Sequence, residues 1–129
     1  MTIELNYLVL VTALTAVLWV PYILDRVAVR GIAGAVGYPE NPKPQSAWAV
    51  RLQKAHGNAV ENLVVFAALV LAAQAVGISS ETTVSAAKMY FWARLLHAVA
   101  YTLAWPWVRT LAFAAGFASQ ATFAWLLLS

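Results

Sequence analysis

A cluster of polar and charged residues stands directly before a long apolar run in the middle of this chain. Residues 51–62 read Arg-Leu-Gln-Lys-Ala-His-Gly-Asn-Ala-Val-Glu-Asn, and residues 63–71 are all apolar. Such a run is typical of a helix that spans a bilayer, where an ionisable side chain is costly and is retained mainly for function. The polar positions recur at i, i+3, i+7 and i+10, which predicts a stripe along one side of a helix: Arg51, Lys54, Asn58 and Glu61. The stripe predicts a polar binding or pairing surface inside a membrane.

The composition of the chain agrees with a membrane protein. Hydrophobic residues make up 63% of its 129 residues and charged residues 10%, against roughly 45–50% and about 25% in soluble domains. This length predicts one domain, residues 1–129. The absence of cysteine excludes disulfides and thiolate metal sites, and we expect no metal. The net charge of +3 is small and scattered, so we expect no nucleic acid among the partners.

The apolar pattern predicts an all-α fold, an integral membrane four-helix bundle, with helices at about 4–26, 47–76, 82–104 and 107–128. Pro21 is expected to kink the first helix. The three closely spaced prolines Pro39, Pro42 and Pro44 cannot continue a helix. Residues 27–46, which also contain three glycines, are therefore predicted to form a polar connection with a flexible backbone. The fourth helix is rich in small residues, which predicts close packing against other helices.

The N-terminal apolar run is predicted to be a retained membrane span rather than a cleaved signal peptide. Glu4 precedes the run and no Lys or Arg does, whereas a signal peptide begins with a basic segment. The run from Leu5 to Leu24 also has the length of about 20 residues that a span requires.

The basic residues predict the orientation of the protein in its membrane. Most of them flank the first and third connections: Arg26, Arg30, Lys43, Arg51, Lys54 and Arg109. Only Lys88 lies near the second connection. Because loops rich in Lys and Arg stay in the cytoplasm, we expect both termini to lie outside it.

A second polar stripe lies on the third predicted helix. Arg94, His97 and Tyr101 are spaced at i, i+3 and i+7. Counting 1.5 Å per residue from the cytoplasmic ends of the two helices places Glu61 and Arg94 at a similar depth of ~15 Å. We therefore predict that these opposite charges pair, within one subunit or across two, since an unpaired charge in lipid is costly. His56 lies about 140° around the helix from Arg51, which favours a supporting or intersubunit role.

Together the stripes offer more donors than one carboxylate can use. The simplest alternative is that Glu61–Arg94 is a structural staple and that the other long side chains snorkel to the lipid headgroups. For the combined set we favour a ligand site for a small anionic peptide-like molecule with two carboxylates and one amine. An apolar second substrate would then arrive laterally from the lipid.

The paired motifs Arg51-x-x-Lys54-Ala55-His56-x-Asn58-x-x-Glu61-Asn62 and Ala93-Arg94-x-x-His97-x-x-Ala100-Tyr101 resemble those of the membrane-associated proteins in eicosanoid and glutathione metabolism, the MAPEG family. The long first connection with Pro39, Pro42 and Pro44 looks more like the bacterial branch of that family. The resemblance covers essentially the whole chain. It implies a homotrimer in a bacterial inner membrane that binds glutathione as co-substrate between subunits near the cytoplasmic side. It also implies that glutathione contacts Asn58, Glu61, Arg94, Tyr101 and Arg109, and that Arg109 is catalytic because it holds the thiol as thiolate. The remaining candidates for binding glutathione are Arg51, Lys54, His56 and His97.

Three functions are compatible with these observations. The first is a glutathione transferase or peroxidase that acts on an apolar electrophile, with membrane lipids and its own copies as partners. The second keeps the same fold and binds a lipid or small anion without turnover. The third is a small exporter that uses Glu61 as a proton or cation site, which a fixed ion pair with Arg94 would disfavour.

The predicted orientation can be tested because the chain has no cysteine of its own. An Asn41→Cys variant in the first connection should be shielded from a membrane-impermeant maleimide in intact cells. A cysteine introduced at the C-terminus, as in Ser129→Cys, should react. Labelling of residue 41 from outside would show that the orientation is inverted.

Overall fold

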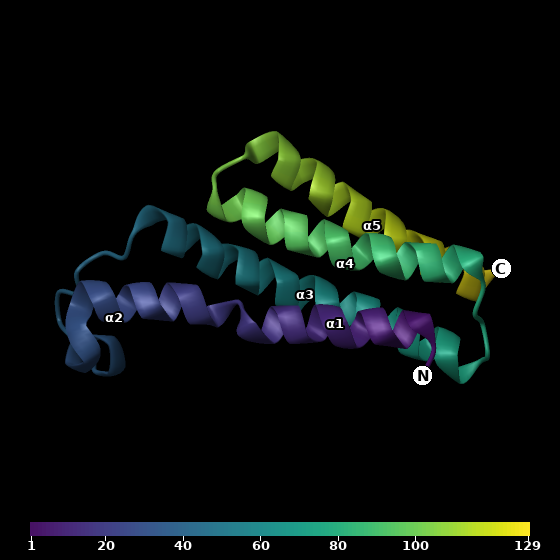
Figure 1. Cartoon of the computed structure of the whole chain (residues 1–129), viewed down its shortest axis with the longest axis horizontal. Helices are drawn as coiled ribbons and strands as arrows, with labels where there is room; N and C mark the ends of the chain where they lie inside the picture. Colours follow the sequence, from purple (N-terminus) through teal and green to yellow (C-terminus); the bar gives the residue numbers. More distant parts are fainter.

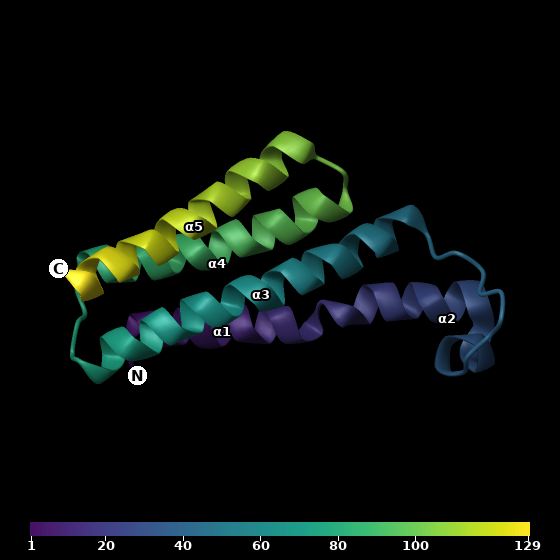
Figure 2. The same cartoon turned by 180° about the vertical axis from the view of Figure 1, so that it is seen from behind.

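The chain folds into five α-helices that form four antiparallel columns. The computed structural model describes all of residues 1–129 and contains no strand; its helices are α1 (Ile3–Val17), α2 (Trp19–Val36), α3 (Ala47–Ala75), α4 (Glu81–Thr102) and α5 (Pro106–Leu128). Figure 1 shows α1 and α2 following one another in one column beside α3, with α4 and α5 packed above them. The view from behind shows the same arrangement, with both termini at one end (Figure 2). The predicted all-α bundle is confirmed.

Three stretches are long and apolar enough to cross a membrane: Ile3–Val36, Ala47–Ala75 and Pro106–Leu128. The fourth column, α4, contains 22 residues. It includes three charged residues, Glu81, Lys88 and Arg94, and it packs alongside the other three columns. The protein is therefore an integral membrane bundle whose most polar helix is flanked by three apolar columns.

The first column bends near Pro21, as its sequence predicts. The helix breaks at Leu18, between α1 and α2. Proline has no N–H to donate to the residue four positions earlier, here Val17, and its ring crowds that residue's carbonyl. The break therefore falls about one turn before the proline itself, and the two helices continue beyond it as one column (Figure 1).

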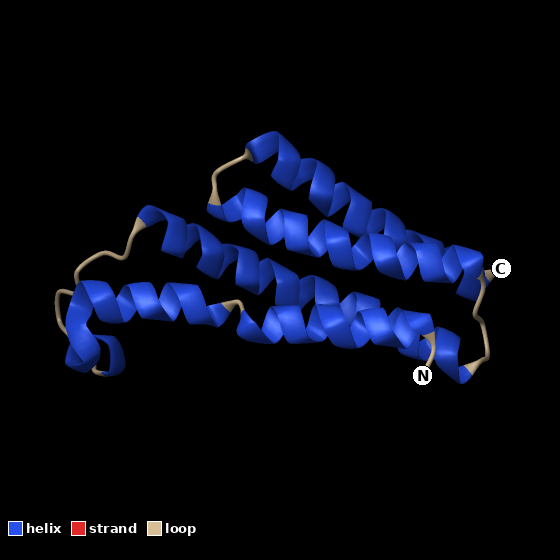
Figure 3. Cartoon of the chain, in the orientation of Figure 1, coloured by secondary structure: helices blue, strands red, loops and turns tan.

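The first connection is shorter than predicted. Helical structure on both sides of Gly31 extends α2 to Val36, so most of residues 27–36 are not part of a loop. Gly31 itself is not helical, with φ of 71° and ψ of 168°, and forms a kink between two helical segments, a conformation that a residue without a Cβ adopts readily. Only residues 37–46, which contain the three prolines, connect α2 to α3 (Figure 3).

Polar contacts tie α2 to the start of α3. The Asp25 carboxylate accepts hydrogen bonds from the backbone and hydroxyl of Ser46 and from the amide of Gln45. Arg26 donates to Gln45 Oε1, and Arg30 donates to the carbonyl of Lys43. These bonds hold a connection that has little apolar surface of its own.

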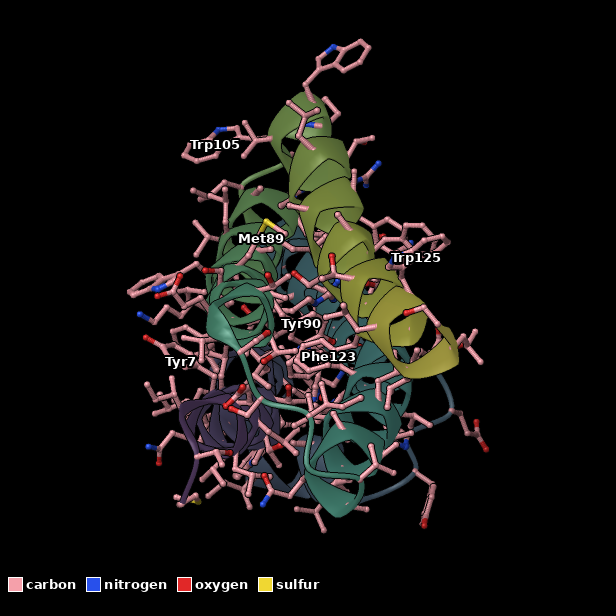
Figure 4. All side chains as sticks on the ribbon, turned by 90° about the vertical axis from the view of Figure 1, so that its right-hand side faces the viewer. Tyr7, Met89, Tyr90, Trp105, Phe123 and Trp125 are labelled. Carbon is pink, nitrogen blue, oxygen red and sulfur yellow. The ribbon has the colours of Figure 1, made fainter.

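Aromatic rings fill the centre of the bundle. Phe66 of α3 stacks on Tyr90 of α4 with ring centroids 3.8 Å apart, and Phe123 of α5 meets Phe66 edge-on at 5.9 Å. Figure 4 shows Tyr90 and Phe123 pointing into this interior, whereas Trp105 and Trp125 point outward. Gly116 of α5 packs against α4, where a Cβ at this position would make an ordinary van der Waals contact, 3.6 Å, with Cδ of Arg94. The predicted close packing of the last helix is confirmed.

The turn between α4 and α5 contains a strained residue. Ala104 has φ of 61° and is the only non-glycine residue with positive φ. Its amide bonds to Tyr101 O at 3.2 Å, and the amide of Trp105 bonds to Ala100 O at 2.8 Å. Glycine is the usual residue at such a helix end because its lack of a Cβ removes the strain. The turn fixes where α5 starts, and therefore where Arg109 lies.

Replacing Ala104 by glycine should stabilise the protein by about 1 kcal/mol, because the left-handed conformation costs alanine energy that glycine avoids. The matched variant Ala118→Gly, at an exposed position inside α5, should destabilise by a similar amount because glycine weakens a helix interior. Thermal unfolding in detergent measures both. Destabilisation by Ala104→Gly, as in Ala118→Gly, would show that Ala104 is not strained.

Candidate functional site

Two cavities open on either side of Tyr101 and Arg109, at the end of the bundle that contains the α2–α3 and α4–α5 connections. We call this the basic end. The larger, the His97 cavity, has a volume of about 270 Å³ and is lined by Asn58, His97, Tyr101, Arg109, Thr110 and Phe113. The smaller, the Arg51 cavity, has a volume of about 170 Å³ and is lined by Arg51, Ala100, Tyr101, Ala104, Trp105, Pro106 and Arg109.

A buried guanidinium, that of Arg94, lies behind Asn58, a residue that lines the His97 cavity, and does not itself line the cavity. Arg94 is 3% exposed, and its Nη2 donates to Oδ1 of Asn58 at 2.7 Å. Its Nε is buried without any hydrogen-bond partner. A neutral amide satisfies one donor and leaves the charge without a counter-ion, an arrangement that is unfavourable in a low-dielectric interior.

The side chain of Asn58 is held in place by Asn62, one turn further along α3, which is bonded in turn by α5. Asn62 donates to both the carbonyl and the side-chain oxygen of Asn58, at 2.9 and 3.3 Å. Gln120 of α5 in turn donates to the carbonyl of Asn62 at 3.1 Å. This chain of bonds joins α3, α4 and α5 and aims the oxygen of Asn58 at Arg94.

The remaining wall of the His97 cavity is polar and aromatic. The ring of His97 is buried, its Nδ1 has no hydrogen-bond partner, and it meets the ring of Tyr101 edge-on at 5.7 Å. The guanidinium carbon of Arg109 lies 4.7 Å from the centre of the Tyr101 ring, a cation–π contact that fixes Arg109. No carboxylate lines the cavity, so it is suited to an anionic ligand.

The polar stripe on α3 separates into two edges rather than one surface. Arg51 and Asn58 are half-buried and face α4, whereas Lys54 and Glu61 are exposed on the outward side. Positions seven apart differ by only about 20° around a helix, but positions three apart differ by about 60°. The i+3 steps therefore separate the four predicted site residues into two pairs.

The predicted pairing of Glu61 with Arg94 does not occur within the chain. Arg94 bonds to Asn58 instead, and Glu61 is exposed. Depth counting placed the two residues at similar levels but ignored the turn of the helix, which points Glu61 away. Pairing across two subunits stays a prediction. Within one chain Glu61 has no fixed ion pair with Arg94 that would disfavour an exporter.

His56 lies apart from both cavities. Its Nδ1 and the hydroxyl of Tyr22 are 2.9 Å apart, so it links α3 to α2. Its position off the stripe agrees with the angular argument from the sequence. The fold thus brings together Asn58, Arg94, His97, Tyr101 and Arg109, places Arg51 at the neighbouring cavity, and leaves Lys54, His56 and Glu61 elsewhere.

Sequence reasoning missed four residues of the site: Asn62, Thr110, Phe113 and Gln120. Gln120 is the only carboxamide in α5, within a mainly apolar segment, and this is a signal that it bonds to another helix. Phe113 follows Arg109 by four positions, the spacing of neighbours on one helix face. The largest cavity in the protein, about 620 Å³, lies between α3 and α5 and is lined almost entirely by apolar residues, so it does not contain the polar chemistry.

Buried polar groups that cross three membrane helices define this protein as an integral membrane bundle with a polar intramembrane site. The chain belongs to the MAPEG family, whose family model matches residues 9–129. No curated protein and no solved structure matches the chain.

The contact between Arg94 and Asn58 should dominate the stability of the site. An Asn58→Leu variant should lose about 2–4 kcal/mol, because it leaves the buried guanidinium with no partner. An Arg94→Leu, Asn58→Leu double variant should lose less than the sum of the two single losses. The parallel cycle with Glu61→Gln and Arg94→Leu, in protein held monomeric, should be additive. Strong coupling in that second cycle would contradict the observed geometry.

Proposed function

We propose that this protein binds glutathione in the His97 cavity and transfers its thiolate to an apolar electrophile, or uses it to reduce one. The observation that carries the proposal is the buried guanidinium of Arg94, which has no counter-ion and one orphaned donor. A buried charge of this kind is retained for function. A carboxylate of glutathione would supply the missing counter-ion of Arg94.

The groups around the cavity fit the rest of this ligand. The hydroxyl of Tyr101 and the orphaned Nδ1 of His97 can exchange hydrogen bonds with peptide groups or carboxylates. Asn58 already uses its oxygen on Arg94, which leaves its amide N–H groups for an acceptor on the ligand. The cationic wall therefore matches a peptide with more carboxylates than amines.

Arg109 is the residue proposed to act on the sulfur. It lies in the first turn of α5, where the positive end of the helix dipole adds to its own charge. A cation close to a thiol lowers the pKa of that thiol and so increases the fraction of reactive thiolate. The thiolate then forms a carbon–sulfur bond with the electrophile, whose leaving group departs with the electron pair.

We further propose that the protein assembles as a homotrimer, with both termini outside the cytoplasm and the basic end facing it. Glu61 supports the assembly, because a carboxylate on the outward side of a membrane helix is costly unless a neighbouring subunit covers it. In that arrangement Glu61 would meet the amine of glutathione bound to the adjacent chain.

Binding without turnover is the alternative, and the cationic walls of both cavities favour it as much as they favour catalysis. The same chain would then hold a small anion or lipid and leave its bonds unchanged. Binding and turnover must therefore be measured separately.

Glutathione should raise the melting temperature of the detergent-purified protein, since a ligand that binds only the native state stabilises it. Calorimetry gives the affinity. Tyr101→Phe removes one hydroxyl from the cavity and should weaken binding about two- to tenfold. Tyr22→Phe removes the hydroxyl that contacts His56 outside the cavity and should bind as the wild type does. Absence of binding to the wild type would refute the proposal.

Arg109→Leu should reduce kcat with a generic aromatic electrophile by at least about tenfold, while the affinity for glutathione changes little, because the residue stabilises the thiolate more than the bound peptide. Thiolate is followed by its ultraviolet absorbance. Arg109→Lys keeps the charge and should lose less. Unchanged thiolate and turnover in Arg109→Leu would remove this residue from the mechanism and favour binding without catalysis.

A further inference from the structure

The Arg51 cavity is separate from the proposed glutathione site. It lies on the other side of Tyr101 and Arg109, and these two residues are the only ones that line both cavities. Arg51 is held there by α4, because its Nε donates to the carbonyl of Thr102 at 3.0 Å. Two guanidinium groups, one from α3 and one from α5, therefore line a space of about 170 Å³.

No acidic side chain of the chain neutralises these two guanidiniums. The cavity has no carboxylate on its wall, and the chain contains only five acidic residues, Glu4, Asp25, Glu40, Glu61 and Glu81. Glu4 and Glu81 lie at the opposite end of the bundle, and Asp25 accepts hydrogen bonds from Ser46 and Gln45. Glu40, in the α2–α3 connection, and Glu61, on α3, are exposed, and neither lines the cavity. Like charges around one small space repel each other, so an anion from outside the chain would stabilise this end of the bundle.

The Glu61 of a neighbouring subunit is also poorly placed to supply that anion. Arg51 and Glu61 are ten residues apart on α3, which separates them by about 15 Å along the helix. Rotation about an axis normal to the membrane leaves depth unchanged. A neighbour's Glu61 in a cyclic assembly would therefore lie at the level of Arg94, well below the Arg51 cavity.

The two helix ends beside the cavity also favour an anion. The last carbonyls of α4, which carry partial negative charge, are already used: Thr102 O by Arg51, and Ala100 O and Tyr101 O by amides of the turn. The start of α5 has no side-chain cap, and its first residue, Pro106, lines the cavity, so the partial positive charge of this helix end lies beside the cavity. The positive charges of both guanidiniums and of this helix end therefore all favour an anion in the cavity.

We propose that the Arg51 cavity binds a phosphate group, from a phospholipid headgroup or from a soluble phosphate. Its volume of about 170 Å³ equals that of about five or six water molecules in the liquid, which suits a group of five heavy atoms. A tetrahedral phosphate presents enough oxygens for two guanidiniums to bind at once, each through paired N–H groups. The site extends beyond the proposed function and depends on no part of it.

The surroundings favour a lipid as the source of the phosphate. Trp105 lines the cavity, and Trp105 and Trp107 are both exposed on the turn, where tryptophans are typical of the headgroup level of a bilayer. Figure 4 shows Trp105 projecting outward from the bundle. A phospholipid next to the turn would place its phosphate near Arg51 and its acyl chains along the apolar face of the helices.

The test uses the full-length protein in a nonionic detergent. The two probes are dihexanoyl phosphatidylglycerol, below its critical micelle concentration, and sodium phosphate. Sodium chloride at matched ionic strength is the reference. Apparent affinities come from thermal-shift titrations. Arg51→Gln should weaken binding by about tenfold or more, as expected for the loss of a charge-assisted contact, and Arg51→Lys by less. The matched control is Arg30→Gln, because Arg30 lies at the same basic end and also donates its Nε to a backbone carbonyl. Arg30→Gln should change the affinity for either probe by less than about twofold.

Each outcome decides the proposal. Saturable binding of either probe that Arg51→Gln weakens and Arg30→Gln preserves supports the phosphate site, and the probe that binds identifies its source. Equal losses in the two variants, or a response no larger than that to sodium chloride, would overturn it. Melting temperatures without probe show whether each variant is folded, and Arg51→Lys serves in place of Arg51→Gln if the latter is not. Glutathione affinity measured in parallel keeps this result distinct from the proposal for the His97 cavity.

Discussion

The burial of Arg94 is the constraint on which the polar interior of this protein depends. A guanidinium 3% exposed in a membrane bundle must find hydrogen-bond partners inside the protein, because lipid offers none. Its partner is the amide of Asn58, which Asn62 orients, and Gln120 bonds to Asn62 from α5. Gly116 of α5 packs against the same arginine side chain. A single buried charge is thus linked to polar residues on α3 and α5, and the site forms where these helices meet α4.

Tyr101 and Arg109 together separate the two cavities of the basic end. The cation–π contact between them makes a wall with a cavity on each side, and Arg109 contributes positive charge to both. The strained turn at Ala104 sets the position of this wall, since it fixes the start of α5. A substitution in the turn would therefore act on both cavities through the placement of one arginine. Because the wall is shared, an anion in one cavity would also reduce the positive potential in the other.

Hydropathy and helix-breaking residues predicted the fold well, because each of these signals is local. The apolar runs marked the helices, Pro21 marked the bend in the first column, and the prolines at 39, 42 and 44 stayed outside every helix. The extent of α2 was not predictable in this way, since Gly31 is compatible with either a loop or a bent helix until its neighbours are known. The motifs also identified the correct helices for the site. They did not identify Asn62 or Gln120, whose roles depend on which helices pack together.

The separation of the α3 stripe shows how a linear pattern can overstate a shared surface. Residues three, four or seven positions apart are commonly assigned to one helix face. Over the ten residues from Arg51 to Glu61, however, the small offsets add up to about 80° around the helix. Asn58 consequently faces the interior and Glu61 the outside, although only three residues separate them. In a membrane protein this difference costs free energy, because an outward carboxylate faces lipid, whereas in a soluble protein it would face water. The outward carboxylate is therefore the feature of this surface that most requires cover from outside the chain, and it is the reason for proposing an assembly of subunits.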